Sequence, residues 1–473
     1  MLFNSFEFWI FFAVVLGSYR LLGHRGQNRM LLVASYIFYG SWDWRFLSLI
    51  ILSTAVDFRV GKALVSPDND EARRKAWVTL SVVVNLGLLA VFKYLGFFVD
   101  SAAAMLTTLG LQANLPSLHI ILPVGISFYT FQTMSYTLDI YRGELKPTDD
   151  LLDFALYVSF FPQLVAGPIE RAKRLLPQIV EPRSPTADDV REGIYCILYG
   201  MFKKVVIADN MAVIANHAFS QDPGSLTGLE ALLGVYAFAF QIYGDFHGYS
   251  LIAQGTARLM GIRLMDNFNH PYFAKNPQDF WRRWHISLST WLRDYLYIPL
   301  GGSRGGARKT YRNLMTTMVL GGLWHGANWT FVVWGTVHGG WLGIHRWIAG
   351  RANGAKDAVD SVAVSLVKVF VTFQLVCVTW LFFRAESVTQ AGGFIGSLFS
   401  GFPLTEFVLI GYPLLAFFVL PTLIYELWVE RRGDLFAMTK VHPVARAAFY
   451  LALVLFLTWF PAPMRSEFIY FQF

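Results

Sequence analysis

The sequence has few cysteines and few charges. Only two cysteines, Cys196 and Cys377, occur in 473 residues, and both stand in apolar stretches. We therefore expect neither a disulfide framework nor a metal site built on thiolates, and predict that both thiols are buried. Charged residues make up 15% of the chain and hydrophobic residues 55%. Because soluble domains carry about 25% charged residues, this composition argues against a soluble globular protein.

Two catalytic signatures are also missing. The chain contains no P-loop and no dinucleotide fingerprint, which excludes the reaction classes that depend on them. His338 and His345 lie on one predicted helix face but lack a His-Glu-x-x-His pattern or a nearby carboxylate pair. We expect core packing or helix-end polarity there and no metal site. The net charge of +7 is not gathered in a basic module, so we expect no nucleic-acid partner.

Apolar runs recur along the whole chain, close to the ~20 residues that cross the hydrocarbon core of a bilayer. They cover roughly 6–22, 29–41 with 45–57, 76–98, 119–138, 152–168, 193–217, 228–257, 313–345, 361–383, 404–428 and 447–463. Several are short, or broken by Gly, Pro or charge. We predict an all-α polytopic integral membrane protein with about 10–13 membrane-embedded helices, built as a single domain over residues 1–473.

Basic residues flank the first and last apolar runs. Arg20, Arg25 and Arg29 follow the first run, and the segment 431–446 is basic before the last one. The positive-inside rule therefore predicts that both chain ends lie outside. Histidines and interrupted helices concentrate between 121 and 345, the predicted catalytic core. Broken helices are tolerated at membrane depth only inside protein or beside a water-filled cavity, so we predict a central tunnel there, with lipid around the exterior.

A histidine in an apolar stretch is the strongest functional signal. His325 lies in Gly321-Gly-Leu-Trp-His-Gly-Ala-Asn-Trp329, between two apolar runs. An ionisable side chain at such depth costs free energy and is usually kept for chemistry or a buried polar network. Histidine is also the natural general base near neutral pH. We interpret the flanking glycines as room for a substrate to approach the backbone. The residues alone leave catalytic and structural roles equally open.

His285 is the second candidate. The stretch 279–298 is predicted as one amphipathic helix with a common face formed by Trp281, His285, Leu288 and Leu292. His285 would orient a substrate or donate to an oxyanion, or take part in a hydrogen-bond or cation–π network. Ser289 falls one turn further on and Ser287 is predicted to point elsewhere, so a covalent serine mechanism lacks support.

A basic, glycine-rich loop is predicted over residues 299–309. Such loops suit phosphate groups, because bare backbone N–H groups and Arg or Lys side chains can both approach them. The alternative is a positive loop that only fixes membrane topology.

Two polar residues interrupt a further apolar helix. Asp245 and His247 stand in Tyr243-Gly-Asp-Phe-His-Gly-Tyr-Ser250. A charged Asp at this depth needs a partner, and we predict an Arg. An ion pair that joins helices is favoured over a catalytic role.

The polar blocks together resemble a known family. Residues 281–302, with Trp-Arg-Arg-Trp-His at their start, and 322–329, with Gly-Leu-Trp-His-Gly-Ala-Asn-Trp, look like the membrane-bound O-acyltransferase superfamily. Within it they are similar to the bacterial branch of alginate O-acetylation membrane proteins. The segments 122–131, 161–168, 267–272 and 468–473 agree, so the resemblance covers nearly the whole chain. His247 is a departure, since a serine is expected at this position.

The resemblance implies a helical membrane fold around a tunnel, with acetyl-CoA entering from the cytoplasmic side as acyl donor and no permanently bound cofactor. It implies His325 as catalytic base and His285 as an auxiliary polar residue. Trp324 and Trp329 would shape the tunnel, and Asn328 would help to steady the oxyanion. The CoA phosphates would meet four basic residues at the cytoplasmic mouth, Arg304, Arg308, Lys309 and Arg312.

The resemblance also implies partners and a location. The acetyl group would cross the bacterial inner membrane, commonly to a periplasmic SGNH-type acetyltransferase that esterifies a polysaccharide. Two alternatives remain open. One is an enzyme of the same fold with another donor, such as a D-alanyl group on a carrier protein for teichoic acid. The other is a polytopic transporter with histidines in a proton relay, although no inverted repeat is evident.

Overall fold

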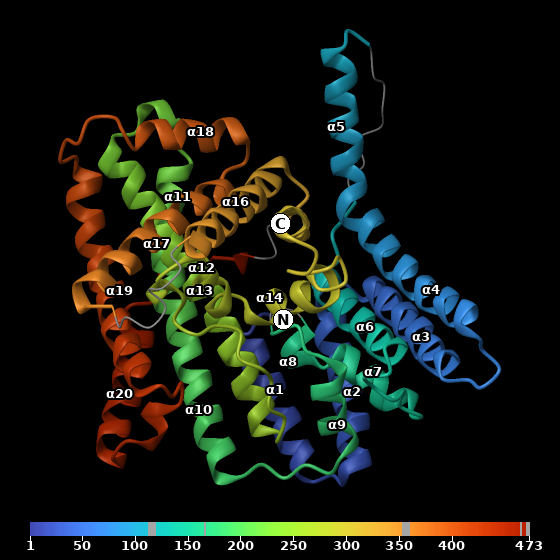
Figure 1. Ribbon diagram of the computed structural model, residues 1–473. Coiled ribbons are helices and arrows are strands. Elements are labelled where there is room, and N and C mark those ends of the chain that lie inside the picture. The colour runs from blue at the N-terminus through green and yellow to red at the C-terminus, as the bar shows by residue number, and fades with distance from the viewer. Residues whose placement is uncertain (112–119, 165–166, 352–359, 464–465, 470–473) are drawn as a thin grey trace. The chain divides into compact units, whose positions relative to one another are not determined.

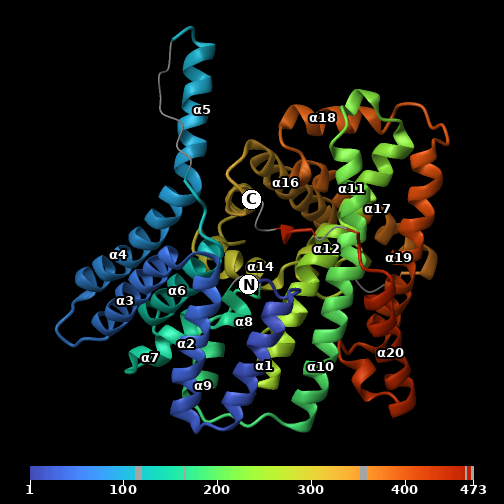
Figure 2. The same cartoon turned by 180° about the vertical axis from the view of Figure 1, so that it is seen from behind.

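The computed structural model describes residues 1–111, 120–164, 167–351, 360–463 and 466–469. Regular secondary structure in these ranges is helical, which confirms the all-α prediction (Figures 1 and 2). The chain forms two compact units, one made of 1–197 with 252–265 and the other of 198–251 with 266–473. The single domain stays a prediction. Parts of two segments that carry the family resemblance, 165–166 and 470–473, lie outside the described residues.

The first unit is built mainly from the N-terminal helices. These are α1 (Phe6–Arg20), α2 (His24–Asp43), α3 (Leu47–Leu64), α4 (Glu71–Leu89), α5 (Leu95–Thr108), α6 (Ile126–Tyr141), α7 (Leu151–Ser159), α8 (Phe161–Leu164) and α9 (Ala172–Val180). Helices α3, α4 and α6 pack together. Between α3 and α4 the buried Asp57 accepts hydrogen bonds from Ser81 (2.6 Å) and Asn85 (2.8 Å). These bonds compensate for the burial of a carboxyl group between apolar helices.

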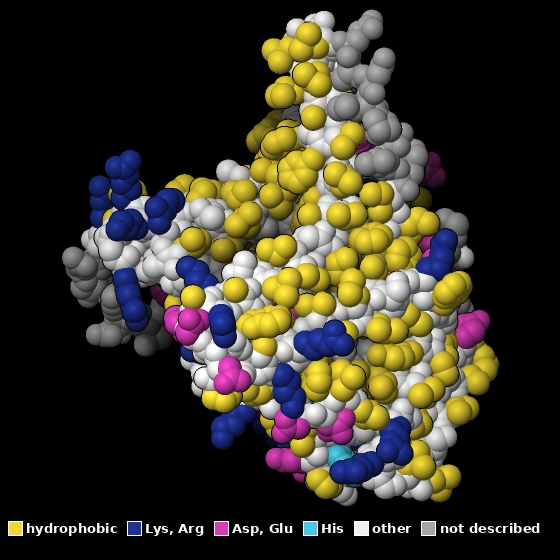
Figure 3. Space-filling view, turned by 90° about the vertical axis from the view of Figure 1, so that its right-hand side faces the viewer, with side chains coloured by type: hydrophobic (Ala, Val, Ile, Leu, Met, Phe, Trp, Pro, Cys, Tyr) yellow, Lys and Arg dark blue, Asp and Glu magenta, His cyan; other side chains and the backbone are white. Residues whose placement is uncertain are grey.

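Three helical stretches of the described chain are long and apolar enough to cross a membrane, Glu71–Thr108, Val362–Arg384 and Glu406–Arg432. The first joins α4 and α5 through a π-helical turn, Ala90–Tyr94. Hydrophobic side chains cover the outer surface of this stretch (Figure 3), and its exposed members include Val83, Leu95, Phe98 and Met105. An exposed apolar surface of this kind suits contact with lipid. The number of embedded helices and the tunnel stay predictions.

The second unit holds the polar residues singled out above. Its helices are α11 (Asp209–Phe219), α13 (Pro277–Arg283), α14 (Ile286–Leu292), α15 (Ala307–His325), α16 (Trp329–Arg351), α17 (Val362–Arg384), α18 (Val388–Ser397), α19 (Glu406–Arg432) and α20 (Pro443–Trp459). Helices α10 (Ala187–Met201) and α12 (Gly228–Leu259) contribute residues to both units. Cys196 and Cys377 are buried, as predicted.

Helices α15 and α16 form a hairpin with a very close contact at glycines. A Cβ atom on Gly322 would lie 2.2 Å from the carbonyl oxygen of Phe331, and one on Gly326 would lie 2.1 Å from the ring of Phe331. A Cβ atom on Gly335 would lie 2.3 Å from a carbonyl oxygen of α15. The interpretation of the glycines beside His325 as room for a substrate is therefore wrong. They allow helix–helix contact, as small residues do in membrane bundles.

This contact gives a stability prediction with a control on the same helix. We expect Gly335→Ala to lower the free energy of unfolding by about 1–3 kcal/mol, because overpacking pushes α15 and α16 apart. On Gly340 a Cβ atom meets nothing within 4 Å. Gly340→Ala should therefore be neutral or stabilising by up to about 1 kcal/mol, since alanine favours a helix. Thermal unfolding of both variants in detergent measures the difference, and equal unfolding temperatures would contradict the close packing.

The stretch 279–298 is not one helix, contrary to the prediction. It forms two short helices, α13 and α14, and His285 lies between them in the left-handed region (φ 43°, ψ 55°). The common face predicted for Trp281 and His285 therefore does not exist. Left-handed backbone costs a residue other than glycine roughly 1–2 kcal/mol. Strain of this kind clusters at functional sites, which draws attention to His285.

Candidate functional site

Two buried histidines from different helical segments come together in the second unit. His325 is the last residue of α15, and His285 stands in the break between α13 and α14. Their ring centroids are 6.2 Å apart. The exposed fraction is 3% for His325 and 0% for His285. The fold thus presents two imidazoles to one small region of the protein interior, from positions far apart in sequence.

Aromatic rings surround this histidine pair. Trp324 contacts both imidazoles, with its centroid 5.9 Å from that of His285 and 5.2 Å from that of His325. Phe246 of α12 lies edge-on to His285 at 4.6 Å, and Trp334 of α16 lies edge-on to His325 at 5.0 Å. These aromatic rings lower the local dielectric and keep bulk water from the imidazoles. Electrostatic interactions at the imidazoles are strengthened as a result.

Hydrogen bonds hold His285 through Nδ1. This atom lies 3.1 Å from Oδ1 of Asn267 and 3.4 Å from the hydroxyl of Ser287. The Ser287 hydroxyl donates to the same Asn267 oxygen (2.9 Å), and the Asn267 amide donates to Ser250 on α12 (3.2 Å). The prediction that Ser287 points away was wrong, because the left-handed turn at His285 places this hydroxyl beside the ring.

Asn267 is the residue that sequence reasoning missed. It is 2% exposed and stands in the irregular segment after α12. The stretch 267–272 contributes to the family resemblance, but the sequence predicted no role for Asn267. A signal was present in the sequence: Asn267-Phe-Asn-His270 places three polar side chains close together in a largely apolar chain. Buried amides in such segments have to be hydrogen-bonded, so this pattern indicates a buried hydrogen-bond network.

Asn328 and Trp329 lie at the start of α16, just after His325. The Asn328 amide donates to the carbonyl oxygen of Glu386 (3.1 Å), and its side-chain oxygen accepts from the N–H of Thr330 (3.0 Å). Asn328 therefore caps the start of α16, and we assign it no contact with an oxyanion. Trp329 is 56% exposed. Of the three residues predicted around His325, the structure brings only Trp324 to both histidines.

The four predicted phosphate-binding residues gather around the start of α15. All four are exposed: Arg304, Arg308, Lys309 and Arg312. The basic loop is shorter than predicted, because α15 begins at Ala307 and takes in three of them. No side chain caps this helix at Gly306. Its first N–H groups and the positive end of its dipole therefore reinforce the basic side chains in attracting an anion.

Asp245 takes part in a buried ion cluster with a lysine, where an arginine was predicted. Lys204 Nζ lies 2.9 Å from Asp245 and 2.8 Å from Asp209, and each of the three side chains is at most 3% exposed. The second oxygen of Asp245 accepts the main-chain N–H of Ile469 (2.7 Å). The cluster joins α11, α12 and the C-terminal segment, so the favoured structural role agrees with the geometry.

His247 belongs to a second buried cluster. Lys203 Nζ lies 2.9 Å from His247 Nδ1 and forms an ion pair with Glu426 of α19. The Tyr243 hydroxyl also donates to Glu426 (2.8 Å). An acidic side chain within an apolar spanning stretch requires such partners. About one turn of α12, residues 243–247, thus supplies side chains to two ion clusters and, through Phe246, to the aromatic rings around His285.

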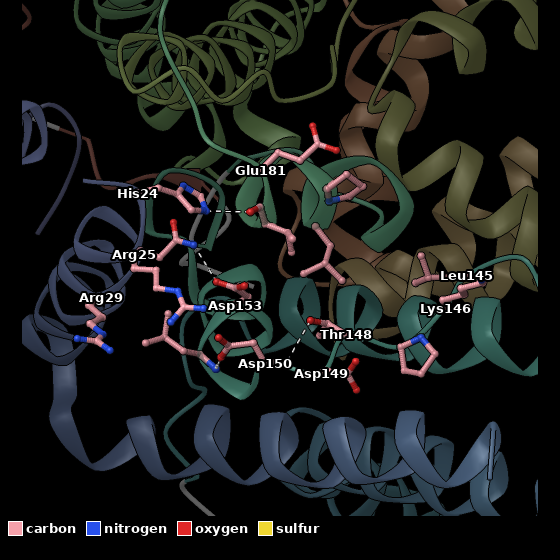
Figure 4. A pocket seen from close by; sticks show the side chains of 16 residues that line it. His24, Arg25, Arg29, Leu145, Lys146, Thr148, Asp149, Asp150, Asp153 and Glu181 are labelled. Atoms are coloured by element: carbon pink, nitrogen blue, oxygen red, sulfur yellow. Dashed lines mark hydrogen bonds between the residues drawn. The ribbon is translucent and has the colours of Figure 1, made fainter. Parts of the chain in front are cut away.

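A polar cavity lies elsewhere, in the first unit. It has a volume of about 770 Å³ and is lined by residues of α2, α7 and α9 and the segment before α7. Figure 4 shows its charged rim, where His24 contacts the carbonyl oxygen of Val180 (2.8 Å) and Asn28 donates to Asp153 (2.7 Å). None of the predicted site residues lines this cavity. This cavity is therefore separate from the predicted site residues.

His338 packs in the core, as predicted. Its Nδ1 accepts a hydrogen bond from the Trp281 indole (3.3 Å), and it is 1% exposed. Across the described ranges, no group of three or more His, Cys, Asp or Glu side chains could hold a metal ion.

Comparison with known proteins identifies the fold family. The model of the MBOAT, or membrane-bound O-acyltransferase, family matches residues 144–384, a range that contains both histidines. A probable alginate O-acetylase AlgI from Pseudomonas putida is 42% identical over the whole of both chains. A peptidoglycan O-acetyltransferase from Helicobacter pylori is 35% identical, over 83% of this chain and 78% of that protein.

A more distant relative is a teichoic acid D-alanyltransferase from Streptococcus thermophilus. It is 29% identical, over 55% of this chain and 68% of that protein. The relatives thus differ in the acyl group and the polymer that their names state, while all are acyltransferases. With a family match over half of the sequence and relatives aligned along most of it, the chain belongs to the membrane-bound O-acyltransferase family and is an acyltransferase.

Proposed function

We propose that this protein moves an acetyl group from cytoplasmic acetyl-CoA across or into the bacterial inner membrane, for O-acetylation of an extracellular or periplasmic polysaccharide. The observation that carries this proposal is the buried pair of His285 and His325, with ring centroids 6.2 Å apart. Acyl transfer to a hydroxyl needs a proton acceptor beside the attacking oxygen, and imidazole serves this purpose near neutral pH.

His325 is the general base in this proposal. Its imidazole takes the proton of the acceptor hydroxyl while the hydroxyl oxygen attacks the thioester carbonyl carbon. The tetrahedral intermediate then breaks its C–S bond, and the imidazolium returns the proton to the departing thiolate. His325 ends α15, and the negative end of the helix dipole stabilises the charge that the base acquires. The surrounding aromatic rings exclude water that would hydrolyse the thioester.

The basic residues at the other end of α15 would hold the phosphates of the donor. The helical rise from Lys309 to His325 corresponds to about 24 Å. A long, narrow donor with its phosphates at one end and its thioester at the other is suited to such a separation. Acetyl-CoA has this form, which supports it as the donor.

Neutralising these cations should weaken donor binding without slowing the chemistry. We expect the combined variant Arg304→Gln, Arg308→Gln, Lys309→Gln to raise KM for acetyl-CoA by about 10- to 100-fold, since each exposed charge contributes about 0.5–1 kcal/mol. kcat should stay within about twofold, because these groups bind ground state and transition state alike. Steady-state kinetics at fixed ionic strength measures both constants. Lys368→Gln and Lys440→Gln, exposed elsewhere in this unit, are matched controls, and an unchanged KM would contradict the proposed anion site.

The named relatives support a polysaccharide as the final acceptor of the acetyl group. Those named as alginate and peptidoglycan O-acetylating proteins support an acetyl group and a glycan as its destination. In the proposed route the acetyl group passes to a periplasmic SGNH-type acetyltransferase, and that partner esterifies the polysaccharide. The higher identity to these relatives than to the D-alanyltransferase favours acetyl over D-alanyl as the transferred group.

The direct test uses purified protein in proteoliposomes with radiolabelled acetyl-CoA inside and an acceptor outside. We expect release of free CoA and appearance of label on the acceptor. A parallel reaction with a D-alanyl carrier protein should show no transfer. Movement of label without consumption of acetyl-CoA would instead identify a transporter, and transfer from the D-alanyl carrier alone would replace the donor in this proposal.

A further inference from the structure

The orientation of the Asn267 amide is fixed by a main-chain group. The N–H of Ser287 points to Asn267 Oδ1 at 3.3 Å, and the Ser287 hydroxyl lies 2.9 Å from the same atom. A main-chain N–H can only donate, so the atom that faces it has to be the oxygen of the amide. Rotating the amide by 180° would set its NH2 group against the main-chain N–H of Ser287 and lose that bond, although the Ser287 hydroxyl could still accept.

The same oxygen determines where the hydrogen lies on His285. Nδ1 of His285 is 3.1 Å from Asn267 Oδ1. An amide oxygen only accepts, so Nδ1 has to carry the hydrogen for this bond to form. A neutral imidazole carries one N–H hydrogen, which leaves a lone pair on Nε2.

We propose that Asn267 is a positioning residue that holds His285 as the Nδ1–H tautomer, so that Nε2 accepts a hydrogen from an O–H or N–H group of the substrates. This inference rests on the proposed function for its catalytic meaning, and it replaces the expectation that neutral His285 donates to an oxyanion. A neutral ring held in this way has no hydrogen on Nε2 to donate, so the oxyanion needs a different donor.

The main chain around His285 supports the positioning role of Asn267 through separate contacts. The carbonyl oxygen of Asn267 accepts the N–H of Ile286 (2.9 Å), and the N–H of Asn269 donates to the carbonyl oxygen of Arg283 (2.9 Å). Asn267 thus contacts the turn through both its main chain and its side chain. These bonds hold His285 in its left-handed conformation, a strained state that persists only where its surroundings determine it.

The tautomer can be read directly by nitrogen-15 NMR of protein labelled at histidine, at a pH where the ring is neutral. The His285 signals are those that disappear in His285→Gln. We expect a protonated Nδ1 and an unprotonated Nε2 in the wild type. A hydrogen on Nε2 in the wild type would overturn the proposal. This measurement needs no enzymatic activity, so it stands even if acetyl transfer proves not to be the reaction.

Two variants of Asn267 test its effect on the reaction. Asn267→Leu removes the acceptor, and we expect kcat to fall by about 100-fold or more with KM little changed, as when a histidine loses the group that fixes its tautomer. Asn267→Asp still accepts from His285 and Ser287, so it should keep kcat within about tenfold of the wild type. A purely structural role would not separate these two variants in this way.

Asn210→Leu is the matched control. The Asn210 amide donates to two main-chain carbonyl oxygens, at 2.8 Å to Val206 and 3.0 Å to Phe460, so its loss should leave kcat per folded molecule unchanged. Equal kcat in Asn267→Leu and wild type would overturn the proposal. If Asn267→Leu fails to fold, the wild-type nitrogen-15 spectrum and the Asn267→Asp rate decide. If wild type transfers no acetyl group while the Nδ1–H tautomer is observed, the proposed function fails and the positioning role of Asn267 remains.

Discussion

His325→Ala is expected to lower the rate of acetyl transfer by about 100- to 10,000-fold, the range that removal of a general base produces. Without the imidazole no group at this position takes the proton of the attacking hydroxyl. The variant should fold, because His325 ends α15 and the helix is held by its close contact with α16. Single-turnover transfer from radiolabelled acetyl-CoA measures the loss, and size-exclusion chromatography in detergent checks the fold.

A second histidine variant tests whether the loss of rate is specific to His325 or follows from any histidine-to-alanine change. His217 is exposed on α11, where its ring contacts Phe407, and it takes no part in the site. His217→Ala should therefore keep the wild-type rate. Transfer by His325→Ala at the wild-type rate would remove His325 from the mechanism and direct attention to His285 as the base.

Lys204→Met is expected to cause the largest loss of stability. Lys204 lies within 3 Å of both Asp209 and Asp245, and its side chain is 1% exposed. Removing the cation leaves two buried carboxylates near each other without a counter-charge. Loss of one member of a buried ion pair costs about 3–5 kcal/mol, so we expect poor expression and a strongly lowered unfolding temperature in detergent.

An exposed lysine provides the comparison for this variant. Lys440 pairs with Asp434 at 2.6 Å, and its side chain is 64% exposed. Lys440→Met should change the stability by less than about 1 kcal/mol, because water and salt screen such a pair. Similar unfolding temperatures for the two variants would show that the Lys204 cluster contributes little to folding.

Local patterns in the sequence predicted the helical membrane fold and the histidine of greatest interest. Long apolar runs determine helices, since in a bilayer each backbone group has to be satisfied within its own segment. His325 stood out because it interrupts such a run at a depth where an ionisable group is costly. The prediction failed at 279–298, where the pattern favoured a continuous helix. The contacts of Asn267 with the chain near His285 outweigh that local preference and hold a left-handed residue there.

The sequence by itself thus determined the fold class and the family resemblance, and it singled out His325 as the candidate base. Tertiary structure decided which groups meet. It brought His285 to His325, placed Asn267 and Ser287 at the His285 ring, and paired Asp245 with Lys204 in place of an arginine. The physical reason is that helix formation depends on neighbours a few residues apart, whereas a buried charge or amide takes whichever partner the packed helices bring within hydrogen-bond distance.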